Sequence, residues 1–263
     1  MHDAAGRVAA HGPLTADYRR LEIEAPDVAR LARPGQFVHV RVAGLDPAAL
    51  RRPFSVYDAV GDRLAVLYKT VGRGTRQLAC LQPGDSVALL GPLGNGFPAP
   101  EKGSRPLLVA GGYGVAPLAF LARRFAPLTG TLFAGGRTAA DLLCLDDFAA
   151  LGWEICTATE DGSLGTRGLV TAALDPWLAA RGATPATLFA CGPAPMLRAV
   201  GGRAIAAGRR AWLSLDKHMV CGLGACLACV QTLRRPDGST WIARVCRDGP
   251  VFEAAEIVWE TRP

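Results

Sequence analysis

Four cysteines near the C-terminus place the tightest constraint on how this chain of 263 residues can fold. Cys221, Cys226 and Cys229 stand on one short segment, separated by four and then two residues. Cys246 follows after sixteen more residues. This C-x4-C-x2-C…C spacing is the plant-type arrangement that holds a [2Fe–2S] cluster on four thiolates. The spacing therefore predicts that residues 221–246 fold around such a cluster.

The residues around these cysteines support metal binding. Gly222 and Gly224 allow the loop to curl, and their lack of a Cβ lets backbone amides approach the sulfurs. In a reducing compartment such a group favours metal binding over disulfides. Structural zinc is the rival reading, although zinc usually takes its cysteines as two separated pairs. The other four cysteines are dispersed among apolar neighbours and are predicted to be core residues: Cys80, Cys144, Cys156 and Cys191.

The hydrophobic pattern divides the rest of the chain into two parts. Residues 1–102 hold short β-rich runs between turn-forming pairs such as Pro34-Gly35 and Gly61-Asp62, which predicts a small antiparallel β-barrel. Its strands are expected at 18–23, 36–42, 54–57, 63–68 and 86–90. Residues 103–215 alternate apolar strands with helices, which predicts an α/β domain with a parallel sheet. Residues 216–263 show little periodicity, and a bound metal centre would fix their structure.

Charge and hydropathy exclude two classes of partner. The formal net charge of +6 comes almost wholly from arginine, and the arginines are scattered in pairs rather than gathered in one patch. That distribution argues against nucleic-acid binding. The sequence shows no signal-peptide core and no run of the roughly 18 apolar residues that a membrane helix needs. We therefore expect a cytoplasmic protein with no membrane contact.

Two segments of the predicted barrel have the chemistry of a phosphate and ring-binding site. The run Arg52-Pro53-Phe54-Ser55 combines a guanidinium suited to phosphate with a rigid turn, an aromatic ring and a hydroxyl. Farther on, Gly74 and Thr75 lie in a glycine-rich turn that precedes a short helix expected at 76–81. Taken alone, each segment is more often an ordinary strand start or turn than a binding site.

Two glycine-containing turns mark a dinucleotide site in the α/β part. Gly111, Gly112 and Gly114 follow an apolar strand directly and precede a helix, the context in which a diphosphate approaches a helix N-terminus. The segment lacks the G-x-G-x-x-G fingerprint. A second strand ends in the sequence Cys191-Gly192-Pro193, again before a helix. Both turns are expected at carboxyl ends of parallel strands, where open α/β sheets bind ligands.

Together these motifs resemble the ferredoxin–NADP reductase superfamily, which carries R-x-[aromatic]-S in an FAD barrel and GG-x-G-x-x-P and CGP in a nucleotide domain. The segments 214–219 and 245–252, with the cysteine loop, are similar to the C-terminus of the electron-transfer subunits of type B dihydroorotate dehydrogenase. The resemblance spans nearly the whole chain and implies three domains: 1–102 for FAD, 103–215 for NAD and 216–263 for the cluster. Phe54 lacks the hydroxyl of the tyrosine common in the superfamily, and Tyr113 interrupts a stretch that is often glycine-rich.

The resemblance also implies roles for matching residues. Arg52 would bind the FAD diphosphate, with Pro53, Phe54 and Ser55 beside the flavin. The isoalloxazine would be lined by Leu67, Tyr68 and Lys69. Phosphate would be held by Gly74 and Thr75. NAD would be positioned by Gly112, Gly114, Cys191, Gly192 and Pro193. The cluster would be ligated by Cys221, Cys226, Cys229 and Cys246.

The implied function is electron transfer in pyrimidine biosynthesis. An FMN-containing dihydroorotate dehydrogenase catalytic subunit, in a heterotetramer with this chain, would pass electrons through the cluster and FAD to NAD. Glu160 and Asp161 follow the strand at 153–158 and favour NAD, because their charge repels a 2′-phosphate; Arg137 and Arg167 oppose that reading, and a solvated turn is the plain alternative. Two other functions stay open: a flavin subunit of a hydrogenase, sulfur reductase or transhydrogenase-like complex, and a zinc-stabilised binding module.

Overall fold

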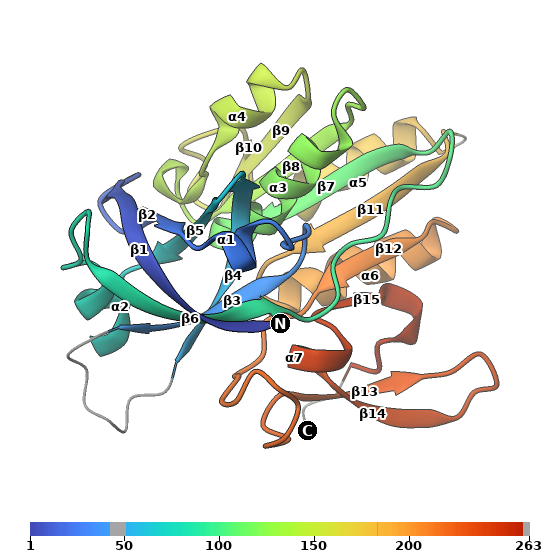
Figure 1. Cartoon of the computed structure of the whole chain (residues 1–263). Helices are drawn as coiled ribbons and strands as arrows, with labels where there is room; N and C mark the ends of the chain where they lie inside the picture. The colour runs from blue at the N-terminus through green and yellow to red at the C-terminus, as the bar shows by residue number, and fades with distance from the viewer. Residues whose placement is uncertain (43–50, 183, 260–263) are drawn as a thin grey trace.

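The chain forms a closed barrel, a seven-stranded sheet covered by helices and a small C-terminal unit (Figure 1). The computed structural model describes residues 1–42, 51–182 and 184–259. The barrel is built from β1 (His2–Pro13), β2 (Tyr18–Glu24), β3 (Phe37–Val42), β4 (Arg52–Val60), β5 (Arg63–Lys69) and β6 (Ser86–Leu93). Two short helices accompany it, α1 (Pro26–Ala29) and α2 (Arg73–Leu78). The predicted barrel is confirmed.

The barrel strands are antiparallel and close in the order β1-β2-β5-β4-β3-β6. The sequence pattern predicted five of these strands but not β1. Residues 2–13 are mostly alanine, glycine and histidine, which have little β propensity of their own. Strand β1 forms because it pairs with β2 on one side and with β6 on the other. These backbone hydrogen bonds close the barrel and outweigh the low propensity of its residues.

The α/β part has the strand order β10-β9-β8-β7-β11-β12-β15. Its strands are β7 (Arg105–Gly111), β8 (Thr131–Gly136), β9 (Glu154–Thr159), β10 (Thr166–Arg167), β11 (Ala186–Cys191) and β12 (Ala211–Ser214). The helices between them are η1 (Gly112–Gly114), α3 (Val115–Phe125), η2 (Ala139–Asp141), α4 (Leu145–Ala150), α5 (Thr171–Ala180) and α6 (Ala194–Ala206). These six strands run parallel, as predicted.

Alternation along β7 explains how helices cover both faces of this sheet. Leu107 and Val109 pack in one cluster with residues of α5 and α6. Leu108 and Ala110 point to the opposite face and pack with residues of α3 and α4. The second cluster also includes Tyr18, Tyr57, Ala65 and Leu67 of the barrel, so the barrel and the sheet share one core.

A partly buried polar contact joins the barrel to the sheet. Arg123 of α3 lies 4.5 Å from the ring centroid of Tyr57 on β4 and donates to its carbonyl and its hydroxyl at 3.2 and 2.6 Å. The same guanidinium pairs with Asp147 of α4 at 3.1 Å, and the Tyr57 hydroxyl also donates to that carboxylate. Burial raises the pKa of Tyr57, so the phenol stays protonated and serves as the donor.

The C-terminal segment joins the sheet as well as forming a hairpin. The hairpin is β13 (Val230–Arg234) and β14 (Thr240–Arg244), followed by α7 (Val245–Asp248), β15 (Val251–Glu253) and η3 (Ala254–Glu256). Strand β15 pairs antiparallel with β12 and is the one antiparallel strand among the seven. In the described ranges no helix is long and apolar enough to cross a membrane.

Phe252 of β15 anchors this segment. Its side chain is 4% exposed and packs in the cluster that holds Leu213, Cys229 and Cys246. We expect Phe252→Ala to lower the free energy of unfolding by about 3–5 kcal/mol, because it removes a buried ring and leaves a cavity. Ile242→Ala on the exposed hairpin surface is the matched control and should change it little. Equal denaturation midpoints for the two variants would show that β15 does not hold the segment in place.

Candidate functional site

Arg52 begins β4 and reaches across to the glycine-rich turn. A Cβ built on Gly74 would lie 3.1 Å from Nε of Arg52 and 3.6 Å from its Cζ. The guanidinium therefore occupies the space that any larger side chain at position 74 would need. The structure brings together two predicted phosphate-binding elements that are far apart in the sequence.

The turn itself is held by Thr75. Its Oγ1 accepts from the amides of Val71 at 2.9 Å and Gly72 at 3.0 Å, and donates to the carbonyl of Gly72 at 3.1 Å. Helix α2 begins at Arg73, so the expected start at 76 was wrong, and Gly74 and Thr75 lie in its first turn. The early start follows from the Thr75 bonds, which close the turn locally.

The three β5 residues predicted to line the isoalloxazine point in different directions. Leu67 packs in the core shared with the sheet. Tyr68 points into the barrel, where its hydroxyl bonds to His11 Nε2 at 2.8 Å and its ring lies 5.7 Å from that of Phe54. Burial raises the pKa of Tyr68 to about 12, which keeps the hydroxyl protonated. Alternation along a strand separates neighbours in this way, and the role of the three in flavin binding stays a prediction.

Lys69 joins a polar contact between barrel and sheet that the sequence reading missed. Its Nζ lies 3.6 Å from Asp141 Oδ1, 3.2 Å from Asp17 Oδ2 and 4.8 Å from the ring centroid of Tyr18. The Tyr18 hydroxyl donates to Asp141 at 2.8 Å. Burial acts to raise the pKa of Asp141, but the bonds from Tyr18 and Thr138 and the nearby cations lower it. In the sequence, Tyr18 resembles any strand residue and Asp141 any turn residue, so no local signal marks them.

A cleft of about 510 Å³ lies between the Arg52 motif and the segment after β12. It is lined by Arg51, Arg52, Pro53, Asp216, Lys217, His218 and Met219. The hydroxyl of Tyr113, from the glycine-rich turn after β7, donates to Asp216 at 3.4 Å. Burial raises the pKa of Asp216, and that bond acts in the opposite direction. The flavin motif, the nucleotide motif and the segment leading into the cysteine loop therefore meet at one place.

The two glycine turns of the sheet touch through their backbones. Strands β7 and β11 are neighbours, with Ala110 opposite Cys191. A Cβ built on Gly114 would lie 2.2 Å from the carbonyl oxygen of Cys191, and one on Gly192 would lie 3.1 Å from Cα of Gly111. Only glycine fits such a contact. The predicted NAD-binding turns thus stand side by side at the carboxyl ends of parallel strands, with Pro193 as the N-cap of α6.

The acidic residues after β9 have different partners. Asp161 accepts from the hydroxyl and amide of Ser163 at 2.7 and 2.9 Å, so its carboxylate stabilises a local turn. Glu160 is exposed at the end of the strand. Arg137 lies 3.9 Å from Asp141. Glu160 is therefore the acidic side chain that stays exposed at this strand end, and its contact with a ribose stays a prediction.

The hairpin brings the ends of the cysteine motif together. Val230 and Arg244 are paired at the base of the hairpin, so the residues just outside them meet. The amide of Cys246 donates to Sγ of Cys229 at 3.4 Å, and both cysteines are buried. Cys221 is partly exposed and Cys226 is exposed. Of the cysteines expected in the core, Cys191 is buried, Cys144 and Cys156 are partly exposed, and Cys80 is exposed, so that prediction was wrong for Cys80.

The loop conformation and its thiols suit an iron–sulfur cluster. Gly222 and Gly224 have φ of +71° and +80°, the left-handed region that favours glycine. Sγ of Cys221 accepts from the amide of Leu223 at 3.3 Å. Burial acts to raise the pKa of Cys221, but amides of the loop outweigh it and lower the pKa to about 6. The thiolate is the form that binds metal, and amide donors to sulfur are characteristic of such centres.

Two further observations bear on the ligands. Burial, reinforced by Cys229, raises the pKa of Cys246 to about 12, so this thiol needs a bound cation to ionise at neutral pH. Within the described ranges, no three side chains of His, Cys, Asp or Glu form a group that could hold a single metal ion. Four soft thiols on one segment match the donor set of the predicted cluster, and their assignment as its ligands stays a prediction.

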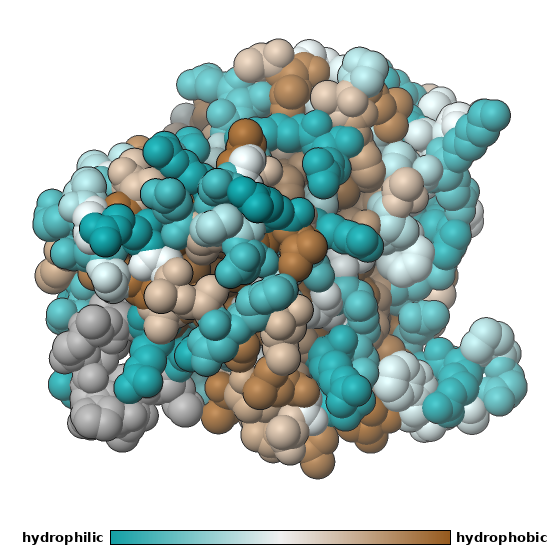
Figure 2. Space-filling view, viewed as in Figure 1, coloured by the Kyte–Doolittle hydropathy of each residue, from teal (hydrophilic) through white to brown (hydrophobic). Residues whose placement is uncertain are grey.

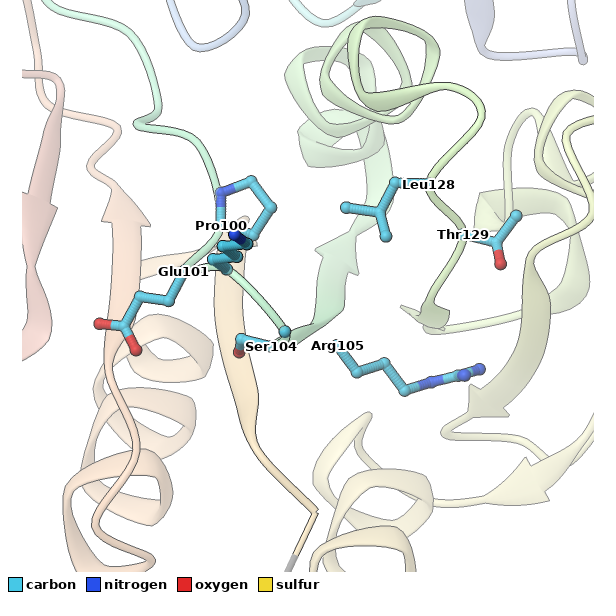
Figure 3. Close-up of a pocket in the computed structure, with 8 residues that line it drawn as sticks. Pro100, Glu101, Ser104, Arg105, Leu128 and Thr129 are labelled. Atoms are coloured by element: carbon cyan, nitrogen blue, oxygen red, sulfur yellow. The ribbon is translucent and has the colours of Figure 1, made fainter.

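A second hollow lies at the opposite end of the sheet, where strand β7 begins. It measures about 360 Å³ and is lined by residues 100–105 with Leu128 and Thr129. Figure 3 shows Glu101 and Arg105 extending away from one another there. Arg105 donates to the carbonyl of Gly130 and to Glu154, each at 3.1 Å. The hollow lies where β7 begins, away from the glycine turns at its other end, and its arginine is engaged in holding strands together.

The contact between the glycine turns yields a prediction about Gly114. We expect Gly114→Ala to lower the free energy of unfolding by about 1–3 kcal/mol, because its methyl group would overlap the Cys191 carbonyl. The control is Gly202→Ala in α6, where a Cβ meets nothing within 4 Å. That change should stabilise the chain by up to about 1 kcal/mol. Urea denaturation measures both, and a stability for Gly114→Ala equal to that of the parent would contradict the close contact.

Comparison with known proteins agrees with this geometry. The family model described as the iron-sulfur cluster binding domain of dihydroorotate dehydrogenase B matches residues 216–258, which include all four cysteines of the motif. A solved structure concerned with an NADH-dependent reduced ferredoxin-NADP oxidoreductase superposes with a TM-score of 0.85 at 31% identity, covering 97% of this chain and 90% of that one. A ferredoxin reductase in carbazole 1,9a-dioxygenase superposes with a TM-score of 0.67 at 25% identity, covering 79% and 66%.

Curated relatives extend the match along nearly the whole chain. The dihydroorotate dehydrogenase B (NAD(+)) electron transfer subunit of Bacillus caldolyticus is 45% identical over 237 residues, 88% of this chain and 89% of that protein. The subunit of the same name from Desulforamulus reducens is 39% identical over 244 residues, 91% and 92% of the two chains. The predicted resemblance is confirmed, and the chain belongs to the family of dihydroorotate dehydrogenase B electron transfer subunits.

Proposed function

We propose that this chain is the electron transfer subunit of a cytoplasmic, NAD-dependent dihydroorotate dehydrogenase in pyrimidine biosynthesis. Its partner would be an FMN-containing catalytic subunit, with which it forms a heterotetramer. The observation that carries the proposal is the meeting of three elements at one cleft: Arg52-Pro53, the Tyr113–Asp216 contact and the segment entering the cysteine loop. Electrons can pass between a one-electron centre and a hydride acceptor only if the sites that bind the two are adjacent.

The chain's own residues would bind and orient the cofactors. FAD, when bound, supplies the chemistry that joins one-electron transfer to hydride transfer. Arg52 would neutralise the diphosphate, with Gly74 leaving room for its guanidinium. The turns that contain Gly114 and Gly192 would let a nicotinamide dinucleotide approach the backbone. Cys221, Cys226, Cys229 and Cys246 would hold the [2Fe–2S] cluster.

The surface around the cysteine loop suits a partner subunit. Leu223 and Leu227 flank the exposed Cys226 and are 42% and 59% exposed. Ile242 on the neighbouring hairpin is 58% exposed. Figure 2 shows apolar surface gathered at the lower end of the molecule, where Figure 1 places the loop preceding β13. Apolar side chains around an exposed ligand would bury against a partner and bring the cluster close to its flavin.

One observation supports a second function: the structure that superposes with a TM-score of 0.85 concerns an NADH-dependent reduced ferredoxin-NADP oxidoreductase. In that case the chain would serve a transhydrogenase-like complex with the same cofactors and a different partner. Reduction of NAD by dihydroorotate in the purified complex supports the first proposal. A complex that reduces NADP with ferredoxin and is inert to dihydroorotate supports the second.

The flavin site is tested at Arg52. We expect Arg52→Ala to bind FAD about tenfold or more weakly, because it loses a charged hydrogen-bond donor to phosphate. Arg52→Lys should retain part of the affinity, since it keeps the charge and loses the planar fork. Flavin content after gel filtration and FAD titration of the stripped protein measure this, with iron content unchanged. Full flavin retention by the alanine variant would contradict the assignment.

The relay is tested at Cys226. We expect Cys226→Ser to lose the [2Fe–2S] absorption and the reduction of NAD by dihydroorotate in the complex, because a ligand is missing. Reduction of FAD by NADH should survive, since the residues proposed to bind FAD and NAD are unchanged. Cys80→Ser, at an exposed cysteine far from the motif, is the control and should change neither. Unimpaired dihydroorotate-dependent activity in a cluster-free Cys226→Ser complex would show that the cluster is not the relay.

A further inference from the structure

His39 is a buried histidine on the outer face of the barrel. Along β3, Val38 and Val40 point into the barrel core. Phe37, on the alternate face, packs in the cluster that includes Cys229 and Cys246. His39 shares that alternate face and is 0% exposed. The strand thus presents an imidazole to the C-terminal segment in a place otherwise lined by apolar side chains.

The imidazole lies directly against the cysteine loop. A Cβ built on Gly222 would lie 2.9 Å from Cε1 and 3.1 Å from Nδ1 of His39. Gly222 follows Cys221, the first cysteine of the motif. On the neighbouring strand, His39 is paired with Pro53, and paired residues of antiparallel strands share a face. Pro53 lines the cleft, so His39 stands between the cleft and the cysteine loop.

Neither ring nitrogen of His39 has a hydrogen-bond partner among the described residues, and both are buried. Imidazole carries at least one N–H in either protonation state. Burial, and then the charge of Arg51, lower the pKa of His39 to about 4, so that the neutral ring offers one donor and one acceptor. A buried donor without an acceptor is costly. The position therefore calls for an acceptor, and the loop beside it is the proposed site of sulfur atoms.

We propose that His39 is a positioning residue for the iron–sulfur cluster, donating its ring N–H to a sulfur on the Cys221 side. The inference rests on the proposed function, because it requires the cluster. Amides of Leu223 and Cys246 already donate to the sulfurs of Cys221 and Cys229. His39 adds a donor from the barrel, so that the domain that binds FAD also sets the potential of the cluster. A donor to sulfur favours the more negatively charged reduced cluster and raises its reduction potential.

The test is an EPR-monitored redox titration of the purified full chain. We expect His39→Leu to reduce the ratio of reduced to oxidised cluster about tenfold at a fixed ambient potential, a shift of about 59 mV for one electron. His39→Asn should restore most of the potential, because its amide N–H lies near the position of Nδ1. An unchanged potential in a His39→Leu protein with full iron content would overturn the proposal, as would a loss that asparagine fails to restore.

Isotope labelling gives a second readout, which is taken first on the unaltered protein. Parent protein labelled with [¹⁵N]histidine should show a ¹⁵N coupling to the reduced cluster in pulsed EPR. In variants with full iron content, the coupling should disappear in His39→Asn and persist in His218→Gln, which changes the histidine nearest to the cysteine motif in the sequence. No coupling in the parent, or a coupling that follows His218, would overturn the proposal. A parent protein without any cluster would instead overturn the proposed function.

Discussion

The packing of the C-terminal segment against the barrel is the contact on which the candidate site depends. Gly222 rests on His39, and residues 216–219 face Arg52 and Pro53 across the cleft. Strand β15 adds itself to the sheet edge and holds the segment there from its other end. Because the segment is fixed at both the barrel and the sheet, the residues that lead into the cysteine loop line the same cleft as Arg52 and Pro53. A freely tethered cluster domain would not give that fixed separation.

Glycine permits the close approaches that this arrangement requires. At Gly114 the chain passes within van der Waals contact of the Cys191 carbonyl, and at Gly222 it adopts a left-handed conformation over an imidazole. Neither position tolerates a Cβ without displacement of backbone or a ring. Glycine at these two positions therefore lets the turns of the sheet touch and lets the cysteine loop rest on His39.

Much of this arrangement follows from local sequence. The five barrel strands named from β-rich runs, the parallel strands of the sheet and the cysteine spacing all rest on patterns a few residues long. Strand β1 was missed because its alanine and glycine residues acquire strand structure only from pairing on both sides. The Tyr18–Asp141 bond was missed for a related reason: its partners are 123 residues apart, and neither has a distinctive neighbourhood. Contacts created by the meeting of two domains leave no local signal.

His39 is a second case in which the local sequence does not predict the surroundings of a residue. In the sequence it is one polar residue in an alternating strand, which by itself predicts a solvent-facing position. The structure instead covers that face with the cysteine loop, so that polarity at this position becomes a buried donor beside proposed sulfur ligands. Alternation along a strand indicates which residues share a face, but not what lies against that face. Whether a polar residue on a strand is buried or exposed depends on the element that packs against that strand. For His39 this element is the C-terminal segment, which begins more than 170 residues later in the chain.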